Sequence, residues 1–500
     1  MLFRMGYLFG ENDLVEDLCY AKYLANNDLY KSDFYINHIA NHVPNERYIF
    51  ANFAAFLGSR VEVFFFLGHA ILSFYLLLGL NRLSDFWIEN KGLKWIALVV
   101  LLLCLDNIHL GGNELYYNML VPSYVAQVFG LWAILFFLEQ KVLWTVFLLF
   151  LTTLFHPLIG AQLWIILLGI AFMNHVKELL ILKNIKNNLD FFIKKVPIML
   201  MGFACFLASM IWILKIQNGY NVGVIDTDKW FEIMQFRASH HYFPLSFPLK
   251  NGLILVPIFS MGYLFFRRNH LLIARFYEVV ALGLFTYMMG VYVLKQPLFL
   301  STQWFATTIW LEMFSVIGIM AFLQNKILIF KQKDYEKQII IGLVMVASMG
   351  IFLMTPPFRL FKNKSYPFFC FENQSTSRQI ALKANILTDT NAVFLIPFDN
   401  TDFKYWSERS VWIDYKSIAH QKAAIVSWYE RVQKVYGVDF KDYHNKLNIN
   451  DLAKQHWLSK STDDFLQLKK EGVTHILTFK NHLLNLPIVI ENKDWIIYKM

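Results

Sequence analysis

Several signatures of soluble enzymes and of ATP-driven transporters are missing from this sequence. It has no phosphate-binding glycine loop of the G-x-x-x-x-G-K type, no H-E-x-x-H helix and no C-x-x-C pair, so ATP-driven transport and zinc hydrolysis of the usual kind lose support. Cysteine is scarce, with four residues in 500. Cys104 and Cys205 fall in apolar runs. Cys19 and Cys370 fall outside them, where a disulfide is chemically allowed, but nothing in the spacing indicates that the two meet.

What the chain has in abundance is apolar sequence. Hydrophobic residues make up 56% of it and aromatic residues 17%, arranged in blocks of roughly twenty, about one bilayer each. The candidate spans are about 61–80, 94–110, 122–138, 142–155, 158–173, 196–214, 252–266, 273–294, 303–323 and 338–356. The pattern predicts an α-helical polytopic membrane protein with about ten transmembrane helices.

Positive charge is distributed unequally between the hairpins on the two sides of these spans. The net charge is +9, yet the basic residues are spread over short hairpins and form no binding stripe, so no nucleic acid partner is expected. One set of alternate hairpins carries 16 Lys and Arg, and the opposite set carries 5. The positive-inside rule places the first set in the cytoplasm. A multi-pass protein in the lipid bilayer, with both termini of this chain extracytoplasmic, is therefore predicted.

Three regions are expected along the chain. Residues 1–60 form an acidic extracytoplasmic segment, with helical periodicity from about Asp13 to Leu24, and residues 61–356 form the membrane body. Residues 357–500 change character, because short β-rich runs alternate with helical patterns, which favours a small extracytoplasmic α/β domain. The expected strands are 392–398, 411–415, 474–479 and 495–499, and the expected helices are 375–387, 421–436 and 461–471, the last capped by Ser461.

The first polar cluster is acidic. At helical spacing Asp13, Glu16 and Asp17 share one face, close behind Glu11. Such a cluster just outside the membrane could supply a general base or bind a divalent cation, which is the one cofactor that the sequence leaves open. A solvated acidic face with helix-capping roles is the alternative.

The second cluster combines one guanidinium with two imidazoles. Arg237, His240, His241 and Tyr242 lie within six residues, a composition that suits a phosphate or pyrophosphate through charge-assisted hydrogen bonds. Metal binding by the histidine pair and a purely structural interfacial loop are the alternatives, and the sequence does not identify a metal site.

Two further hairpins on the same side carry polar residues. The first runs from His109 through Gly111-Gly112 to Glu114, where the glycines allow close approach to a ligand or simply a reverse turn. The second is His156-Pro157, which marks a helix end and could also contribute a ligand.

Ionisable residues inside spans are costly and usually face a cavity or a partner. Glu312 and His69 are the conspicuous cases. They could line a proton or substrate path, or they could be hydrogen-bonded to neighbouring helices.

Near the C-terminus, the run from Trp406 to Lys416 is dense in polar residues. Within it, Trp406, Trp412 and Tyr415 offer faces for sugar rings, and packing of the domain itself is the alternative use.

Taken in order, these motifs resemble uncharacterised bacterial polytopic proteins related to the GT-C superfamily of membrane glycosyltransferases. The resemblance rests on the acidic segment, the Gly-Gly hairpin, the His-Pro break, the Arg-x-x-His-His-Tyr loop and the Ser-x-Arg-Ser-Val-x-x-Asp-x-Lys run. It covers nearly the whole chain. In such enzymes a helix precedes the acidic loop, and no apolar segment long enough for it stands before residue 61 here.

The resemblance implies a GT-C-like fold in a bacterial plasma membrane and an extracytoplasmic active site. The substrates would be a polyprenyl-phosphate-linked sugar and a cell-envelope or lipid-linked glycan acceptor. Asp13 would be the base, with Glu11, Glu16 or Asp17 as substitutes, and Arg237, His240 and His241 would hold the lipid phosphate. Two other classes stay open: a transporter or flippase of lipid-linked glycans, and a non-catalytic protein that binds lipid phosphates.

Overall fold

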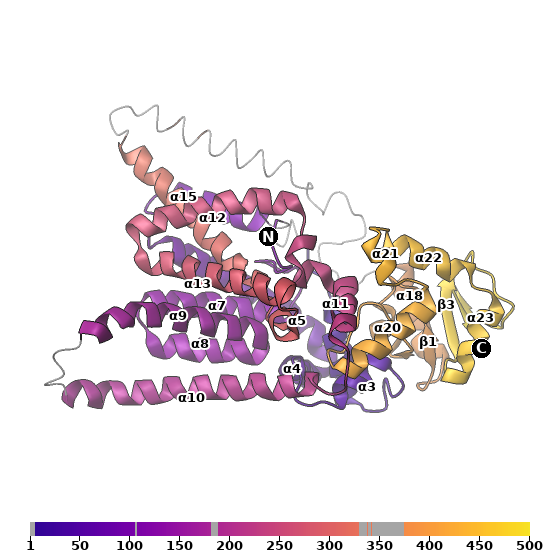
Figure 1. The fold of residues 1–500 in the computed structure, drawn as a ribbon. Coiled ribbons are helices and arrows are strands. Elements are labelled where there is room, and N and C mark those ends of the chain that lie inside the picture. The colour runs from indigo at the N-terminus through magenta and orange to yellow at the C-terminus, as the bar shows by residue number, and fades with distance from the viewer. Residues whose placement is uncertain (1–5, 106–107, 182–188, 330–337, 339–341, 343–374) are drawn as a thin grey trace.

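The computed structural model describes residues 6–105, 108–181, 189–329, 338, 342 and 375–500. Within them the chain is mainly helical. A bundle of long helices lies at one end of the molecule, a small α/β domain lies at the other, and the N-terminal helices lie between the two (Figure 1).

Long apolar helices form the bundle, as the sequence predicts. They are α5 (Val61–Ser84), α6 (Lys91–Val99), α7 (Pro122–Leu138), α8 (Val142–Phe155), α9 (Pro157–Ile181), α10 (Leu189–Tyr220), α12 (Leu249–Asn269), α13 (Leu271–Met288) and α15 (Thr308–Ile329). Five described segments are long and apolar enough to cross a membrane: 48–84, 200–220, 249–269, 271–293 and 297–326. Each of the first nine predicted spans overlaps one of these helices, but the predicted span 94–110 is helical only as far as the π-helical turn η2 (Val100–Cys104) that follows α6. The tenth, 338–356, lies almost wholly outside the described residues.

Proline sets the start of two bundle helices. Pro122 and Pro157 occupy the first positions of α7 and α9, where the missing backbone N–H removes no intrahelical hydrogen bond. His156 separates α8 from α9 in an extended conformation, which confirms the helix end that the sequence predicts at His156-Pro157.

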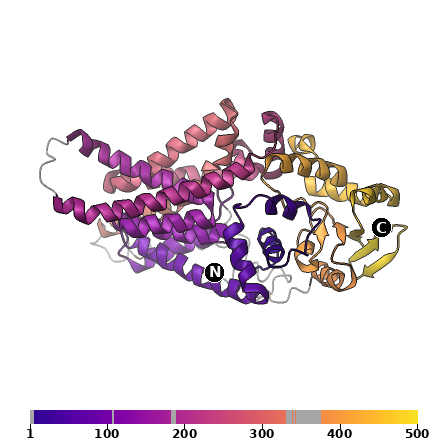
Figure 2. The same ribbon diagram turned by 90° about the horizontal axis from the view of Figure 1, so that it is seen from below.

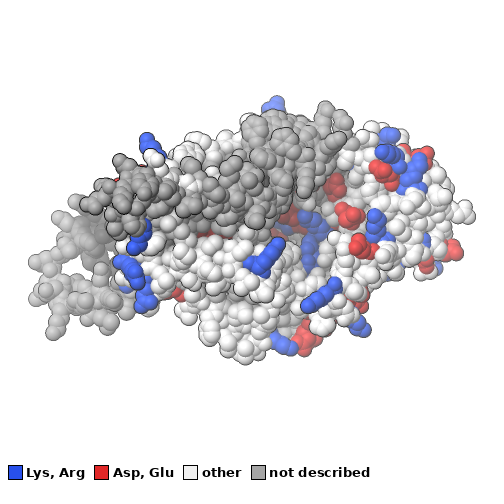
Figure 3. Space-filling view, turned by 90° about the horizontal axis from the view of Figure 1, so that it is seen from above, with Lys and Arg blue, Asp and Glu red and all other residues white. Residues whose placement is uncertain are grey.

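Charge distinguishes the two ends of the bundle. Arg82 closes α5, Lys141 precedes α8, and Arg267 and Arg268 close α12, all at the end of their helices away from the α/β domain. Figure 3 shows Lys and Arg side chains gathered at that end. This is the distribution expected of a helical protein associated with a membrane.

The N-terminal segment is helical and continues into the bundle. Helix α2 (Leu14–Ala25) matches the predicted periodicity and is followed by α3 (Phe34–Ala40) and α4 (Tyr48–Leu57). A 3₁₀ turn, η1 (Gly58–Arg60), connects α4 to α5.

The C-terminal region is a five-stranded sheet with helices. Its strands β1 (Val393–Leu395), β2 (Ser410–Val411), β3 (His475–Phe479), β4 (Ile488–Glu491) and β5 (Trp495–Lys499) have the order β2-β1-β3-β5-β4. Strand β1 is parallel to β2 and β3, while β5 is antiparallel to β3 and β4. The helices are α18 (Thr376–Leu387), α19 (Phe403–Ser407), α20 (Lys422–Tyr436), α21 (Phe440–His444), α22 (Ile449–Ser459) and α23 (Thr462–Leu466), and Ser461 caps α23 as predicted.

The N-terminal segment and the C-terminal domain are joined by buried charges. Lys404 Nζ lies 3.0 Å from Asp414 Oδ2 and 3.6 Å from Asp33 Oδ1, and these three side chains are at most 3% exposed. The second oxygen of Asp33 accepts the backbone N–H of Val411 at 2.9 Å. Figure 2 shows the N-terminal helices lying against the domain. The segment thus has a firm anchor that its own sequence does not reveal.

Candidate functional site

Four distant parts of the chain meet where the bundle, the N-terminal segment and the C-terminal domain adjoin. Asp13 Oδ1 lies 2.8 Å from Lys416 Nζ. Arg237 Nη2 donates a hydrogen bond of 2.6 Å to the backbone oxygen of Lys416. His241 Nδ1 lies 3.3 Å from the backbone oxygen of Gly111. Lys416 therefore contacts both Asp13, the predicted base, and Arg237, the cation of the predicted phosphate-binding cluster. Arg237, His240 and His241 are called the anion clamp below.

Asp13 is the accessible member of the acidic cluster. It is the N-cap residue of α2, makes no capping hydrogen bond with its side chain, and is 67% exposed. Desolvation by the surrounding protein would raise the pKa of Asp13, but the charge and hydrogen bond of Lys416, with the charge of Arg47, hold it below its ordinary value. Asp13 is consequently ionised at neutral pH.

Glu16 and Asp17 lie on the same helix but are only 6% and 1% exposed. Both contact Arg47, the N-cap residue of α4, and the Arg47 Nη1 to Asp17 Oδ1 distance is 3.1 Å. Burial raises the pKa of Glu16 to about 7, against the opposing charge of Arg47. These two acidic side chains fasten α2 to α4 through Arg47 and thereby hold Asp13 in place.

Arg237 and the two histidines come from α11 (Thr227–Tyr242), whose helical path breaks at Ala238. The guanidinium lies 5.1 Å above the Tyr415 ring, and its Nε is buried and finds no hydrogen-bond partner among the described residues. Desolvation and then the neighbouring His241 and Arg237 lower the pKa of His240 to about 3. Desolvation also lowers the pKa of His241. At neutral pH the clamp is one cation with two neutral imidazoles.

The hydrogen bond of His241 fixes the tautomer of its ring. A carbonyl oxygen can only accept, so Nδ1 must carry the proton that it shares with Gly111, and Nε2 is left as an acceptor. Gly112 allows this close approach, because a Cβ on it would lie 2.2 Å from His241 Nδ1 and its φ is +76°. His241 is therefore suited to accept a hydrogen bond from a hydroxyl, whereas Arg237 suits an anion.

Tyr242, the last residue of α11, is buried and serves as an anchor. Its ring hydroxyl bonds to the side chain of Gln303, and its backbone oxygen accepts a 2.6 Å hydrogen bond from Tyr287. The sequence grouped it with the phosphate ligands, but its contacts fasten α11 to the bundle.

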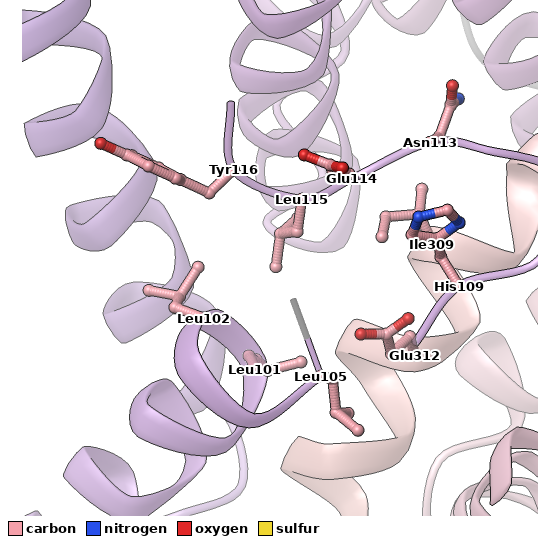
Figure 4. A pocket seen from close by; sticks show the side chains of 10 residues that line it. All are labelled: Leu101, Leu102, Leu105, His109, Asn113, Glu114, Leu115, Tyr116, Ile309 and Glu312. Carbon is pink, nitrogen blue, oxygen red and sulfur yellow. The ribbon is translucent and has the colours of Figure 1, made fainter. Parts of the chain in front are cut away.

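His109, Glu114 and Glu312 line one small cavity beneath the site (Figure 4). Its volume is about 10 Å³, which is room for about one water molecule. Asn251 holds the backbone of His109 through a 2.9 Å hydrogen bond, and His109 lies close enough to His241 for their charges to interact. The cavity brings the mid-span Glu312 to the Gly-Gly hairpin, a connection that the sequence did not indicate.

The two other predicted histidines make helix contacts. His156 Nδ1 accepts the Ile159 N–H at 3.4 Å, a cap for the start of α9. His69 is fully buried, and its Nε2 lies 2.8 Å from the backbone oxygen of Tyr117. His69 thus ties α5 to the hairpin that carries Glu114.

In the run from Trp406 to Lys416, the aromatic rings pack inside the domain. Trp406 is 8% and Trp412 4% exposed, and the Tyr415 ring stacks on Phe398 with centroids 4.0 Å apart. The possibility of sugar-stacking faces at these positions therefore loses its geometric basis. Two residues of this run reach the site: Tyr415, which lies under Arg237, and Lys416, to which the sequence assigned no role of its own.

Arg47 is the second site residue that sequence reasoning missed. Its partners lie about 30 positions earlier in the chain, so no local pattern could reveal the pairing. As for metals, among the residues that the structure describes no group of three or more His, Cys, Asp or Glu side chains could hold an ion. Cys19, discussed above for a disulfide, is buried and free, and Cys370 lies outside the described residues.

One comparison with known proteins bears on this site. Residues 376–435 match a domain of unknown function, DUF6798. The matched stretch runs from α18 into α20 and includes both Lys404 and Lys416. No curated protein matches the chain.

Proposed function

We propose that this protein is a membrane glycosyltransferase that transfers a sugar from a polyprenyl-phosphate donor to a cell-envelope or lipid-linked acceptor at the extracytoplasmic face. The observation that carries the proposal is the contact of Lys416 with both Asp13 and Arg237. It sets an accessible carboxylate beside two cations at the end of a bundle of apolar helices. A base and an anion clamp are the two elements that transfer from a phosphate leaving group requires.

In the reaction, the acceptor hydroxyl gives its proton to Asp13 while its oxygen bonds to the anomeric carbon. The bond from that carbon to the phosphate oxygen breaks, and the electron pair leaves with the polyprenyl phosphate. Arg237 and Lys416 stabilise the negative charge on the departing phosphate. His241 accepts a hydrogen bond from a sugar or acceptor hydroxyl through Nε2.

Lys416 has a double part in this scheme. In the free protein it lowers the pKa of Asp13, which makes the carboxylate a weak base. When the donor phosphate arrives, the ammonium turns toward it, so that Asp13 loses a stabilising contact and becomes more basic. Donor binding would thus activate the base.

The test uses the purified full-length protein in nanodiscs with radiolabelled polyprenyl-phosphate sugars and a glycan acceptor. Asp13→Asn should lower the transfer rate by roughly 10²–10⁴-fold, the usual contribution of a general base. Asp228→Asn is the matched control, because Asp228 also pairs with a lysine, Lys295 at 3.4 Å, but on an exposed surface. Unchanged transfer by Asp13→Asn would remove the base from the scheme. If the wild type transfers no sugar yet moves lipid-linked glycan across vesicles, the protein is a transporter.

A further inference from the structure

An apolar groove opens on the outer surface of the bundle, between α5, α7 and α8. Its volume is about 320 Å³, at the lower end of the range for ligand pockets. Its lining residues are Leu72, Tyr75, Val128, Phe129, Trp132, Phe136, Trp144 and Leu148. Tyr75 is 46% and Trp144 57% exposed, so the groove is open to whatever surrounds the helices.

Aromatic side chains form one continuous wall of this groove. Ring centroids lie 6.1 Å apart from Tyr75 to Trp132, 5.8 Å from Trp132 to Phe136, and 6.1 Å from Phe136 to Trp144. The Trp132 indole N–H donates a 3.1 Å hydrogen bond to the backbone oxygen of Tyr75, which fixes that ring. The groove is therefore a formed structure, and the lining surface that it exposes is apolar.

Two cations stand at one end of the aromatic wall. Arg82 lies 5.7 Å from the Trp132 ring centre and 5.9 Å from that of Phe136, and Lys141 lies 5.4 Å from the Phe136 ring centre. Both pair with Glu139, at 2.5 Å and 2.8 Å. Two cations share one carboxylate, so a positive charge is left over. Arg82 is 40% and Lys141 49% exposed, so their remaining N–H donors can reach a ligand.

We infer that this groove binds an anionic phospholipid. One acyl chain lies along Tyr75, Trp132 and Phe136, and the phosphate is held by Arg82 and Lys141. Charge complementarity favours this occupant. Its anionic headgroup would meet Arg82 and Lys141 at one end of the groove, and the acyl chain attached to that headgroup would fill the apolar part. The leaflet is the one predicted to be cytoplasmic, opposite the proposed catalytic face, so the inference does not depend on the proposed function.

The groove carries its own reporter, since Trp144 is exposed at its wall. The full-length protein is placed in nanodiscs of phosphatidylcholine that contain increasing fractions of phosphatidylglycerol with brominated acyl chains, which quench tryptophan on contact. Brominated phosphatidylcholine at the same fractions is the reference. The expected result is stronger quenching by the anionic lipid, and Trp144→Phe should reduce the difference to the part that Trp132 contributes.

Charge variants identify the headgroup contact. The double variant Arg82→Gln with Lys141→Gln should lose roughly tenfold in apparent affinity for the anionic lipid relative to the zwitterionic one. Arg267→Gln with Arg268→Gln is the matched control, because it removes the same charge from the same end of the bundle, away from the groove. The control should behave like the wild type.

Two results would overturn the inference: equal quenching of the wild type by both lipids, or equal lipid preference in the two double variants. If the first double variant does not fold, Leu148→Phe replaces it, because the larger ring fills the groove and leaves every charge in place. Leu148→Phe should reduce the extra quenching by phosphatidylglycerol, and its persistence at wild-type strength would place the lipid outside the groove.

Discussion

Two aspartate–lysine contacts join the N-terminal segment to the C-terminal domain, and their surroundings differ sharply. Asp33 and Lys404 are at most 1% exposed, and Asp414 supplies a second carboxylate. Asp13 and Lys416 are 67% and 25% exposed. A buried pair cannot be broken without leaving an uncompensated charge, whereas an exposed pair is nearly neutral for stability. The first contact therefore holds the junction together, and the second is free to serve chemistry.

The largest expected effect is on the buried lysine. Lys404→Met should destabilise the protein by ~3–5 kcal/mol, since Asp33 and Asp414 would remain buried without their cation. Thermal unfolding in detergent, followed by tryptophan fluorescence, measures the loss. Lys295→Met, which removes an exposed lysine from its pair with Asp228, should leave the melting curve unchanged. Equal melting of the two variants would remove the distinction between buried and exposed pairs.

The opposite pattern is expected at the exposed lysine. Lys416→Met should cost at most about 1 kcal/mol of stability but lower sugar transfer by roughly 10²–10³-fold, because a charge that stabilises the leaving phosphate is lost. Lys416 also lowers the pKa of Asp13, so its removal should move the acid limb of the pH–rate profile to higher pH. A variant that loses stability as severely as Lys404→Met would contradict a functional part for Lys416.

A smaller effect is expected at the glycine beneath His241. Gly112→Ala places a Cβ against the imidazole and strains a positive φ, so both stability and transfer should fall. Gly472→Ala is the control, because its φ is +92° and its Cβ would meet nothing within 4 Å. Each substitution should lower the free energy of unfolding by about 1 kcal/mol through backbone strain. Only Gly112→Ala should also lower the rate of sugar transfer. Equal activity in both would mean that the position of His241 is unimportant.

The smallest expected effect is a change in the slope of melting temperature against pH. Burial raises the pKa of Glu16 from 4.5 to about 7, so the folded protein holds a proton there that the unfolded chain releases. The stability that this proton contributes is fully present below pH 4.5 and is lost as the pH rises through about 7. Glu16→Gln should therefore flatten the fall in melting temperature between pH 5 and about 7.5.

Glu408→Gln serves as the reference for this slope. Desolvation opposes the charge of Lys22, but the net effect is a lowered pKa for Glu408. The stability that this carboxylate contributes is present above its ordinary pKa and is lost only in acid. If the melting temperature falls equally steeply with pH in Glu16→Gln and in Glu408→Gln, Glu16 does not hold the extra proton.

Elements with local signals were predictable from the sequence. The helix over 375–387 appears as Thr376–Leu387 with Ser375 as its cap, and Ser461 caps α23. The missed strand β4 is four residues long and mostly exposed, so no alternation of polar and apolar residues marks it. The helices α19, α21 and α22 were also missed, and two of them have only five residues.

The residues of the candidate site show the same difference between local and long-range sequence signals. Asp13, Arg237, His240 and His241 could be proposed from the sequence because unusual residues cluster within a few positions of one another. Arg47 and Lys416 could not, because each acts on a partner that lies far away in the chain. Residue types suggest chemistry, but the pairing of an acid with its cation is a tertiary property.

The bond between Asp33 and Val411 has a consequence for biogenesis. Its two residues are 378 positions apart, and ribosomes add about 5–20 residues per second. The N-terminal helices are therefore made roughly 20–75 s before their partner strand exists. During that interval the carboxylate of Asp33 can cap α3 through the Ile36 N–H, but it lacks both Lys404 and the Val411 N–H, so the N-terminal segment is completed only when the last part of the chain has been made.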